Sequence, residues 1–160
     1  RSDWDLKRHG EFSGTDFTYK DEETGESYIP HVVEYSIGLN RLMLVLLFDA
    51  YTVDRERVVL KLDKKVAPYK AAIFPLVRNK PEIVEKARKI YTGLLAQGVH
   101  VDWDDRGNIG KRYLAQDEVG TPVCVTVDYT TMEDDTVTIR DRDTTSQERV
   151  KVTDLFNIIK

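Results

Sequence analysis

The sequence predicts an α/β fold in which a mixed five-stranded sheet carries three helices, preceded by a smaller α+β segment. Between Lys70 and Tyr129, strand-like apolar runs alternate with helical runs, which is the pattern of parallel strands joined by helical crossovers. After Tyr129 two short strands follow, at 136–140 and 148–152, and we expect them to pair as a hairpin. A last helix, capped by Thr153 or Asp154, completes the fold.

The first part of the chain, residues 1–65, predicts fewer and less regular elements. An acidic turn at 21–26 indicates a hairpin, residues 31–36 form a strand-like run, and a helix is expected from Arg41 to about Tyr51. That helix is apolar nearly all round, so it needs cover on every side. We therefore expect residues 1–65 to be the end of a larger domain and residues 66–160 to fold as a domain of their own.

The elements of residues 66–160 are predicted from the spacing of apolar residues and from the prolines and glycines that begin or end helices. An apolar strand begins after Lys70, a helix with one apolar face runs from Pro81 to Gly98, and residues 99–103 form the next strand. A polar turn leads into a short basic helix, residues 109–118, which Gly120 ends. Valines 123, 125 and 127 then alternate with small residues, which predicts a buried central strand.

Composition limits the classes of function. The 160 residues are 41% apolar, which is enough for a core, and the formal net charge is −4. Residues 1–65 contain 10 basic and 13 acidic side chains, and residues 66–160 contain 14 and 15. This charge balance argues against a non-specific polyanion binder, and since neither part is basic, any contact with nucleic acid must be a small patch.

The cysteine and the apolar runs indicate a cytoplasmic protein. Cys124 is the only cysteine, and its place in the valine-rich strand is typical of a core residue rather than a nucleophile. The longest apolar run, residues 42–48, is far shorter than the roughly 20 residues that span a bilayer. The first ten residues have no apolar signal core. We expect a reducing compartment and no membrane partner.

Metal and nucleophilic chemistry have no support in the pattern. The three histidines, at positions 9, 31 and 100, lie far apart without carboxylates or cysteines at ligand spacing. Neither a Ser-His-Asp order nor a phosphate-binding glycine loop can be assembled. We expect no metal site.

Two groups of polar residues could carry function. Glu34 and Ser36 are alternate residues of a strand-like run and would share a face, with Arg41 at the next helix start. Such a set suits a small ligand with an ammonium group and a phosphate, or else it is a structural ion pair. The second group combines basic, amide and acidic residues of the short helix and the later strand ends: Lys111, Arg112, Gln116, Asp128, Arg140, Arg142 and Asp143.

The second group has two interpretations. Ligands of open α/β sheets gather at the carboxyl ends of strands, and mixed basic and amide groups can read bases in a single-stranded loop. The alternative is a solvated charged surface without a ligand. We expect the topology to gather Arg112, Asp128, Arg140 and Arg142 at one edge of the sheet.

Several long motifs resemble the glycyl-tRNA synthetase family. APYKAAIFPLV, IGKRYLAQDEVGTPVCVTVDY and TIRDRDT resemble its anticodon-binding domain. RSDWDLKRH, SGTDFTY and YIPHVVEYSIGLNR resemble the end of its class II catalytic domain, including the third class motif. The resemblance covers nearly the whole chain, on both sides of the boundary that the charged run 63–65 before Pro68 places between residues 65 and 66.

The resemblance also implies roles for the two groups. Arg41 and Glu34 would bind ATP, with Arg41 on the γ-phosphate, and Ser36 and Glu34 would bind glycine. Lys111, Arg112, Gln116, Asp128, Arg140 and Arg142 would bind the anticodon of a glycine tRNA, with Lys111 meeting phosphate.

The enzyme of this family ligates glycine to its tRNA with ATP and Mg²⁺, and a homodimer is expected for its full length. Because the first and second class motifs have no counterpart, we expect this chain to be inactive alone and to need no cofactor. A non-catalytic nucleic-acid-binding module and a polymerase accessory subunit of the same family remain the alternatives.

Overall fold

The computed structural model describes residues 2–159, and its contacts divide the chain into two compact units, residues 1–42 and 43–160. Unit 1 begins with helix α1, Trp4–Ser13, which the sequence pattern did not indicate. Strands β1, Tyr19–Lys20, and β2, Ser27–Tyr28, then pair antiparallel, which confirms the hairpin around the acidic turn. Residues 29–38 are extended but join no sheet, so the expected strand at 31–36 is absent.

Helix α2, Leu39–Ala50, confirms the expected apolar helix and crosses from unit 1 into unit 2. In the described part of the chain, Ala50 is the buried member of this helix. Its large apolar side chains are exposed around the whole circumference: Leu39, Leu42, Met43, Leu44, Val45, Leu46, Leu47 and Phe48. No helix within residues 2–159 has the length and apolar character needed to cross a bilayer.

In unit 2, helix α2 is followed by a hairpin that the sequence pattern missed. Strands β3, Tyr51–Asp54, and β4, Arg57–Leu60, pair antiparallel, and β4 packs against helix α4, Ile109–Val119. Val59 of β4 is completely buried. The domain boundary between residues 65 and 66 stays a prediction, since the hairpin before it packs within the same unit as the sheet.

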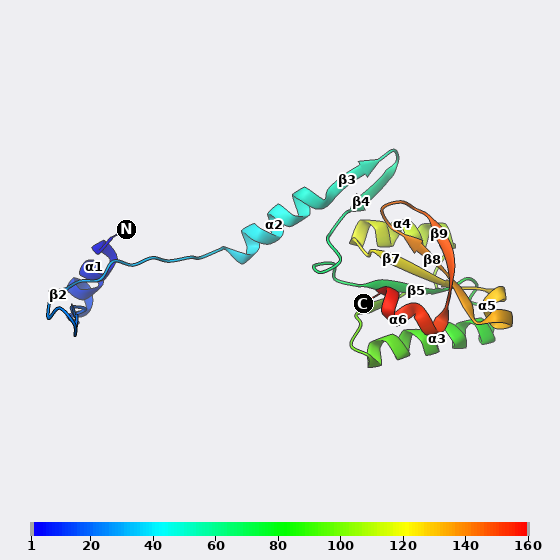
Figure 1. The fold of residues 1–160 in the computed structure, drawn as a ribbon. Coiled ribbons are helices and arrows are strands. Elements are labelled where there is room, and N and C mark those ends of the chain that lie inside the picture. The colour runs from blue at the N-terminus through cyan, green and yellow to red at the C-terminus, as the bar shows by residue number, and fades with distance from the viewer. Residues whose placement is uncertain (1, 160) are drawn as a thin grey trace. The chain divides into compact units, whose positions relative to one another are not determined.

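The sheet of unit 2 confirms the predicted fold class. Its five strands lie in the order β6-β5-β7-β8-β9, with β5, β6 and β7 parallel and the last two pairings antiparallel (Figure 1). The central strand is β7, as expected. The strand bounds are Ala71–Pro75 for β5, Val101–Trp103 for β6, Val123–Val127 for β7, Thr136–Asp141 for β8 and Gln147–Lys151 for β9.

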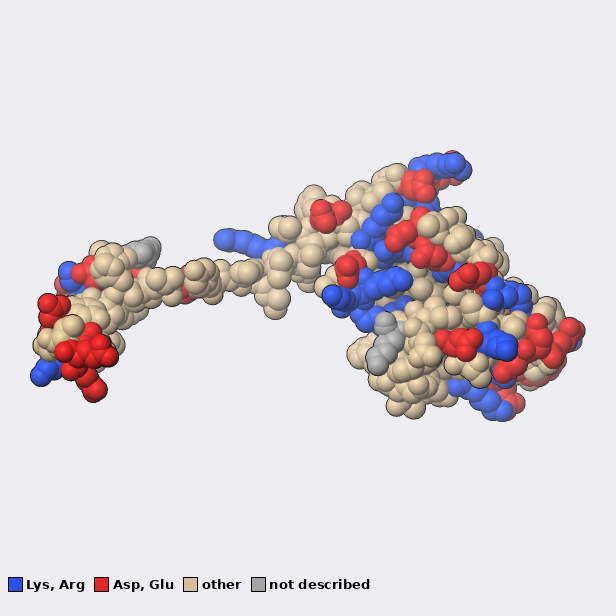
Figure 2. All heavy atoms as spheres, in the orientation of Figure 1, with Lys and Arg blue, Asp and Glu red and all other residues tan. Residues whose placement is uncertain are grey.

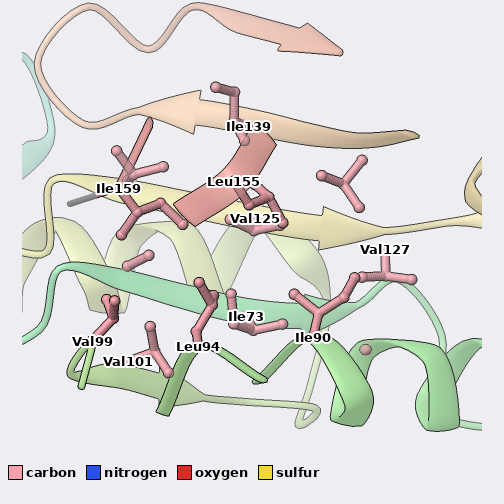
Figure 3. Packing of buried hydrophobic residues seen from close by; sticks show 14 of the residues in the cluster. Ile73, Ile90, Leu94, Val99, Val101, Val125, Val127, Ile139, Leu155 and Ile159 are labelled. Atoms are coloured by element: carbon pink, nitrogen blue, oxygen red, sulfur yellow. The ribbon is translucent and has the colours of Figure 1, made fainter. Parts of the chain in front are cut away.

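Helices cover both faces of this sheet. Helix α3, Pro81–Ala96, and helix α6, Leu155–Ile159, which follows the 3-10 turn η1, Val152–Asp154, enclose the larger core on one face (Figure 3). On the other face, α4 packs over Ala72, Phe74 and Cys124. A short helix α5, Tyr129–Asp134, connects β7 to β8.

Candidate nucleic-acid interface

A cleft of about 650 Å³ opens at the carboxyl ends of strands β5 and β6. Three pieces of chain line it: the loop after β5, the loop after β6 and the start of α4. In open α/β sheets this is the edge at which ligands bind. The lining residues are Leu76, Val77, Arg78, Asn79, Asp105, Gly107, Asn108, Ile109 and Arg112.

The rim of the cleft offers hydrogen-bond donors beside an acceptor. Arg78 and Asn79 are exposed and Asp105 is partly exposed, so their polar groups face solvent. The Asn108 side chain caps α4 by accepting a hydrogen bond of 2.9 Å from the Lys111 backbone N–H. The positive end of the helix dipole and the exposed Lys111 lie at this N-terminus, which favours an anionic or electron-rich ligand.

Arg112 ties the two loops of the cleft together. Its Nη1 donates to the Pro75 carbonyl at 2.7 Å, and its Nη2 donates to the Gly107 carbonyl at 3.1 Å. Two longer bonds, of 3.4 Å each, reach the carbonyls of Leu76 and Asp104. The side chain is buried and its Nε has no partner. Arg112 therefore holds the two loops that line the cleft in position. A direct contact between Arg112 and a base stays a prediction.

The other basic and amide candidates are also buried. The exposed fractions are 3% for Arg112, 4% for Gln116, 6% for Arg140 and 4% for Arg142. Gln116 donates to Asp102 Oδ2 at 2.6 Å and accepts from Thr121 Oγ1 at 2.5 Å. Its amide thus joins α4 to strand β6 and to the segment that enters β7.

Arg140 forms a bidentate ion pair with Asp117 of α4, at 2.9 and 3.0 Å. Asp117 is fully buried, and Arg57 of β4 adds a third contact of 3.1 Å to the same carboxylate. The burial of Asp117 could not be read from the sequence pattern, because an acidic residue in a short polar helix is usually exposed.

Arg142 holds the segment after β4 on the end of α4. It donates to the carbonyls of Leu62 and Gly120 at 3.0 and 2.8 Å, and it pairs with Asp143 at 2.9 Å. Gly120 has φ +87°, and a Cβ there would lie 2.9 Å from Leu62 Cδ1 and 3.0 Å from the Leu60 carbonyl. Glycine is therefore required both by the backbone conformation and by the close approach of this segment.

Asp128 follows β7, at the same end of the sheet as the cleft, but its carboxylate is already occupied. It caps α5 by accepting from the Thr131 N–H at 3.1 Å, and it pairs with Arg149 at 2.8 Å. Partial burial acts to raise the pKa of the Asp128 carboxyl, but hydrogen bonds from Arg149 and Thr131 outweigh it and lower that pKa.

The expectation that these residues gather at a single edge of the sheet is wrong. Strand β8 runs antiparallel to β7, so Arg140 stands opposite Cys124 and Arg142 bonds to the Pro122 carbonyl. Both lie at the amino end of β7, whereas Asp128 lies at its carboxyl end. The prediction assumed that every later strand ended at the cleft, which holds only for parallel strands.

The small-ligand candidates lie in unit 1. Glu34 and Ser36 are exposed in the extended segment 29–38, and Arg41 is exposed in the first turn of α2. Among residues 2–159, no hydrogen bond or ion pair joins these three side chains, so their roles stay predictions. The same range contains no group of His, Cys, Asp and Glu side chains that could hold a metal ion.

Comparison with known families decides what the domain around the cleft is. The family described as "Anticodon binding domain" matches residues 70–160, which is more than half of the chain. The chain belongs to the anticodon-binding domain family. Its match begins at the residue before β5 and includes all five strands of the sheet and both loops of the cleft.

Whole-protein relatives match the anticodon-binding domain together with the preceding segment. Glycine–tRNA ligase of Borreliella afzelii is 50% identical over 100% of this chain and 37% of its own length. The ligase of Clostridium tetani is 45% identical over 99% of the chain and 35% of its own length. The ligase of Thermobifida fusca is 47% identical over 95% of the chain and 34% of its own length. The chain thus spans about a third of the length of the curated relatives it matches.

The anticodon-binding domain presents three exposed or partly exposed polar residues that sequence reasoning did not single out: Arg78, Asn79 and Asp105. Asn79 and Asp105 lie in the loops that follow β5 and β6. Their position directly after two parallel strands was the available signal, because those strand ends form the ligand edge of such a sheet.

Proposed function

We propose that this chain is part of a glycine–tRNA ligase and that residues 70–160 bind the anticodon of a glycine tRNA in the cleft beside α4. The observation that carries the proposal is 45–50% identity to ligases of this name over almost the entire chain. The cleft supports it, since it places donors and an acceptor at the ligand edge of the sheet.

The chemistry of the cleft suits cytosine. Glycine codons begin with two guanines, so the matching anticodons end in two cytosines. An unpaired cytosine offers an amino group that needs an acceptor, and a carbonyl that needs a donor. Asp105 supplies a carboxylate, and Arg78 and Asn79 supply donors on the opposite loop. Lys111 meets a phosphate at the start of α4, where its charge adds to the helix dipole.

The buried candidates act indirectly in this proposal. Arg112 fixes the distance between the two loops, and Gln116, Arg140 and Arg142 hold α4 against the sheet and the β3–β4 hairpin. Asp128 holds the start of α5. Each therefore affects anticodon binding through the position of an element rather than through contact with a base.

ATP, Mg²⁺, glycine, a homodimer and a cytoplasmic location belong to the same proposal for the full-length ligase. Glu34, Ser36 and Arg41 are the residues proposed for ATP and glycine. All three side chains are exposed, in the segment 29–38 and at the start of α2. The relatives named above are ligases, so no observation favours a polymerase accessory subunit or a non-catalytic module.

Binding of RNA to the 160-residue chain tests the proposal. A glycine anticodon stem-loop is titrated beside a stem-loop whose two cytosines are replaced, at several salt concentrations. We expect a preference for the cytosines that Arg78→Ala and Asp105→Asn each reduce by about 1–3 kcal/mol.

Lys151→Ala is the matched control, because Lys151 is exposed on β9, at the opposite side of the sheet from β5 and β6. Equal affinity for both stem-loops, or no binding by the wild-type chain, would refute the assignment of the cleft.

A further inference from the structure

An arginine lies stacked on an aromatic pair at the outer edge of the sheet. Trp103 ends β6, which is an edge strand, and the Tyr91 ring of α3 packs against it edge-to-face at 5.8 Å. The guanidinium carbon of Arg88 lies over the Trp103 ring, 3.6 Å from its centroid. Both rings are half-buried against the core, whereas Arg88 is exposed. The half-buried Trp103 ring therefore supports the exposed guanidinium of Arg88.

Arg88 differs from its neighbours because it has no acidic partner. Lys86 pairs with Asp135 at 2.5 Å, and Lys89 pairs with Glu85 at 2.8 Å. Among residues 2–159, the Arg88 side chain makes no ion pair and no hydrogen bond, although the Arg88 carbonyl accepts a hydrogen bond of 3.0 Å from the Thr92 hydroxyl. A guanidinium carries five N–H donors, and stacking on an indole uses its face and none of those donors. The donors of Arg88 are thus free for an outside acceptor.

The stack also lies next to the cleft along the chain. Asp105, which lines the cleft, is two residues after Trp103, so their Cα atoms are at most about 7 Å apart. The intervening Asp104 pairs with Arg106, which reduces its repulsion of an anion. An RNA strand that left the cleft along the loop after β6 would therefore pass close to the Arg88–Trp103 stack.

We propose that Arg88, held in place by Trp103, binds a backbone phosphate of the tRNA anticodon arm outside the bases read in the cleft. The inference rests on the proposed function and adds a second contact to it. The planar fork of a guanidinium matches two phosphate oxygens, and stacking restricts its rotamers before RNA arrives. The contact adds affinity without reading sequence.

Titration of two charge-removing variants separates a specific contact from general attraction. Arg88→Ala and Lys89→Ala each remove one exposed positive charge from neighbouring positions of α3. We expect Arg88→Ala to weaken binding of the glycine anticodon stem-loop about fivefold and to reduce the salt slope by about 1. The loss is the same for the stem-loop with replaced cytosines. Lys89→Ala has less than half of this effect.

Tryptophan fluorescence provides a second readout at the site itself. The chain has two tryptophans, Trp4 and Trp103, so Trp4→Phe leaves Trp103 as the only tryptophan, whose emission is excited selectively at wavelengths that tyrosine does not absorb. We expect the stem-loop to change Trp103 emission in this background, and we expect the change to be lost in Arg88→Ala. Arg88→Lys keeps the charge but not the planar fork, so it restores part of the affinity and little of the emission change.

The outcomes distinguish the two proposals. If the wild-type chain binds the stem-loop, with a preference that Arg78→Ala and Asp105→Asn reduce, while Arg88→Ala and Lys89→Ala behave alike, then the phosphate contact is refuted and the proposed function stands. A Trp103 emission that stays constant on binding refutes the contact in the same way. Absence of stem-loop binding by the wild-type chain refutes both proposals.

Discussion

Arg140 and Asp117 face each other through two parallel hydrogen bonds of 2.9 and 3.0 Å, with both side chains buried. Arg57 approaches the same carboxylate at 3.1 Å and also donates to the Arg142 carbonyl at 2.8 Å. One acidic side chain therefore joins three elements, α4, β8 and the β3–β4 hairpin. A charge buried this deeply is tolerated only because it is fully paired.

Replacing Asp117 tests this network. Asp117→Asn keeps the shape of the side chain but leaves the buried Arg140 without its counter-charge and leaves Arg57 paired with Asp54 alone. We expect the free energy of unfolding to fall by about 3–5 kcal/mol, measured by urea denaturation. Glu118→Gln, at the next and exposed position of α4, is the control and should change stability by less than about 0.5 kcal/mol. Equal effects of the two substitutions would show that the network contributes little.

The β3–β4 hairpin leads to a prediction about the domain boundary. A chain of residues 66–160 lacks Arg57, the buried Val59 and the Leu62 contacts at Gly120. We expect it to be less stable than residues 43–160 by at least about 2 kcal/mol, because buried apolar area and one ion pair are lost. Thermal unfolding of the two chains measures the difference. Identical melting temperatures would instead show that residues 66–160 fold without the hairpin, which would support a domain boundary between residues 65 and 66.

The five-stranded sheet was predictable because its signals are local. Continuous apolar runs, Pro81 at a helix start and Gly120 at a helix end each report on their own neighbourhood in the sequence. The β3–β4 hairpin was not predictable in this way, since its burial depends on α4, about fifty residues later.

The candidate site was less predictable than the fold. An arginine in a sequence carries no sign of burial, and the partner that buries Arg140 lies 23 positions away. Basic residues near strand ends were therefore interpreted as exposed ligands, whereas the structure places Arg112, Arg140 and Arg142 in the interior. The place of Arg78 in the cleft depends on β5 and β6 being parallel neighbours, and the sequence does not reveal which strands are neighbours.

Cys124 carries a pH dependence whose sign follows from its pKa. Burial raises the pKa of the Cys124 thiol from 9.0 to about 12. Between these values the unfolded chain loses the proton while the folded chain keeps it, so stability present below pH 9 is lost as pH rises toward 12.

Measurement of the free energy of unfolding from pH 8 to 10.5, in wild type and Cys124→Ala, checks this dependence. The substitution itself costs packing at every pH, so the informative quantity is the change with pH. We expect the stability advantage of the wild type to shrink above pH 9. An advantage that stays constant over this range would contradict a buried, protonated thiol.

Arg112 and Lys111 are neighbours on α4, but Arg112 is buried and Lys111 is exposed. We therefore expect their substitutions to have different effects on stability and on RNA binding. Arg112→Ala removes the ties to the Pro75 and Gly107 carbonyls, so both loops of the cleft lose a fixed position. We expect it to lower stability, to weaken glycine stem-loop binding by about 1–3 kcal/mol and to relax discrimination against replaced cytosines. Lys111→Ala removes an exposed charge, so it should weaken all stem-loops alike, with a shallower salt slope and unchanged stability.

Hydrogen exchange separates the loss of loop order from the loss of a base contact in Arg112→Ala. We expect faster amide exchange at 104–108 in this variant, measured at a temperature where the whole domain remains folded, because the loop no longer has its arginine tie. In Arg112→Lys the amides of residues 104–108 should exchange nearly as fast as in Arg112→Ala, since a single ammonium group cannot span carbonyls on two loops. If exchange is unchanged while cytosine discrimination is lost, Arg112 reads a base directly. If affinity and discrimination both survive while exchange accelerates, the order of these loops does not govern binding, and the anticodon must lie elsewhere on the domain.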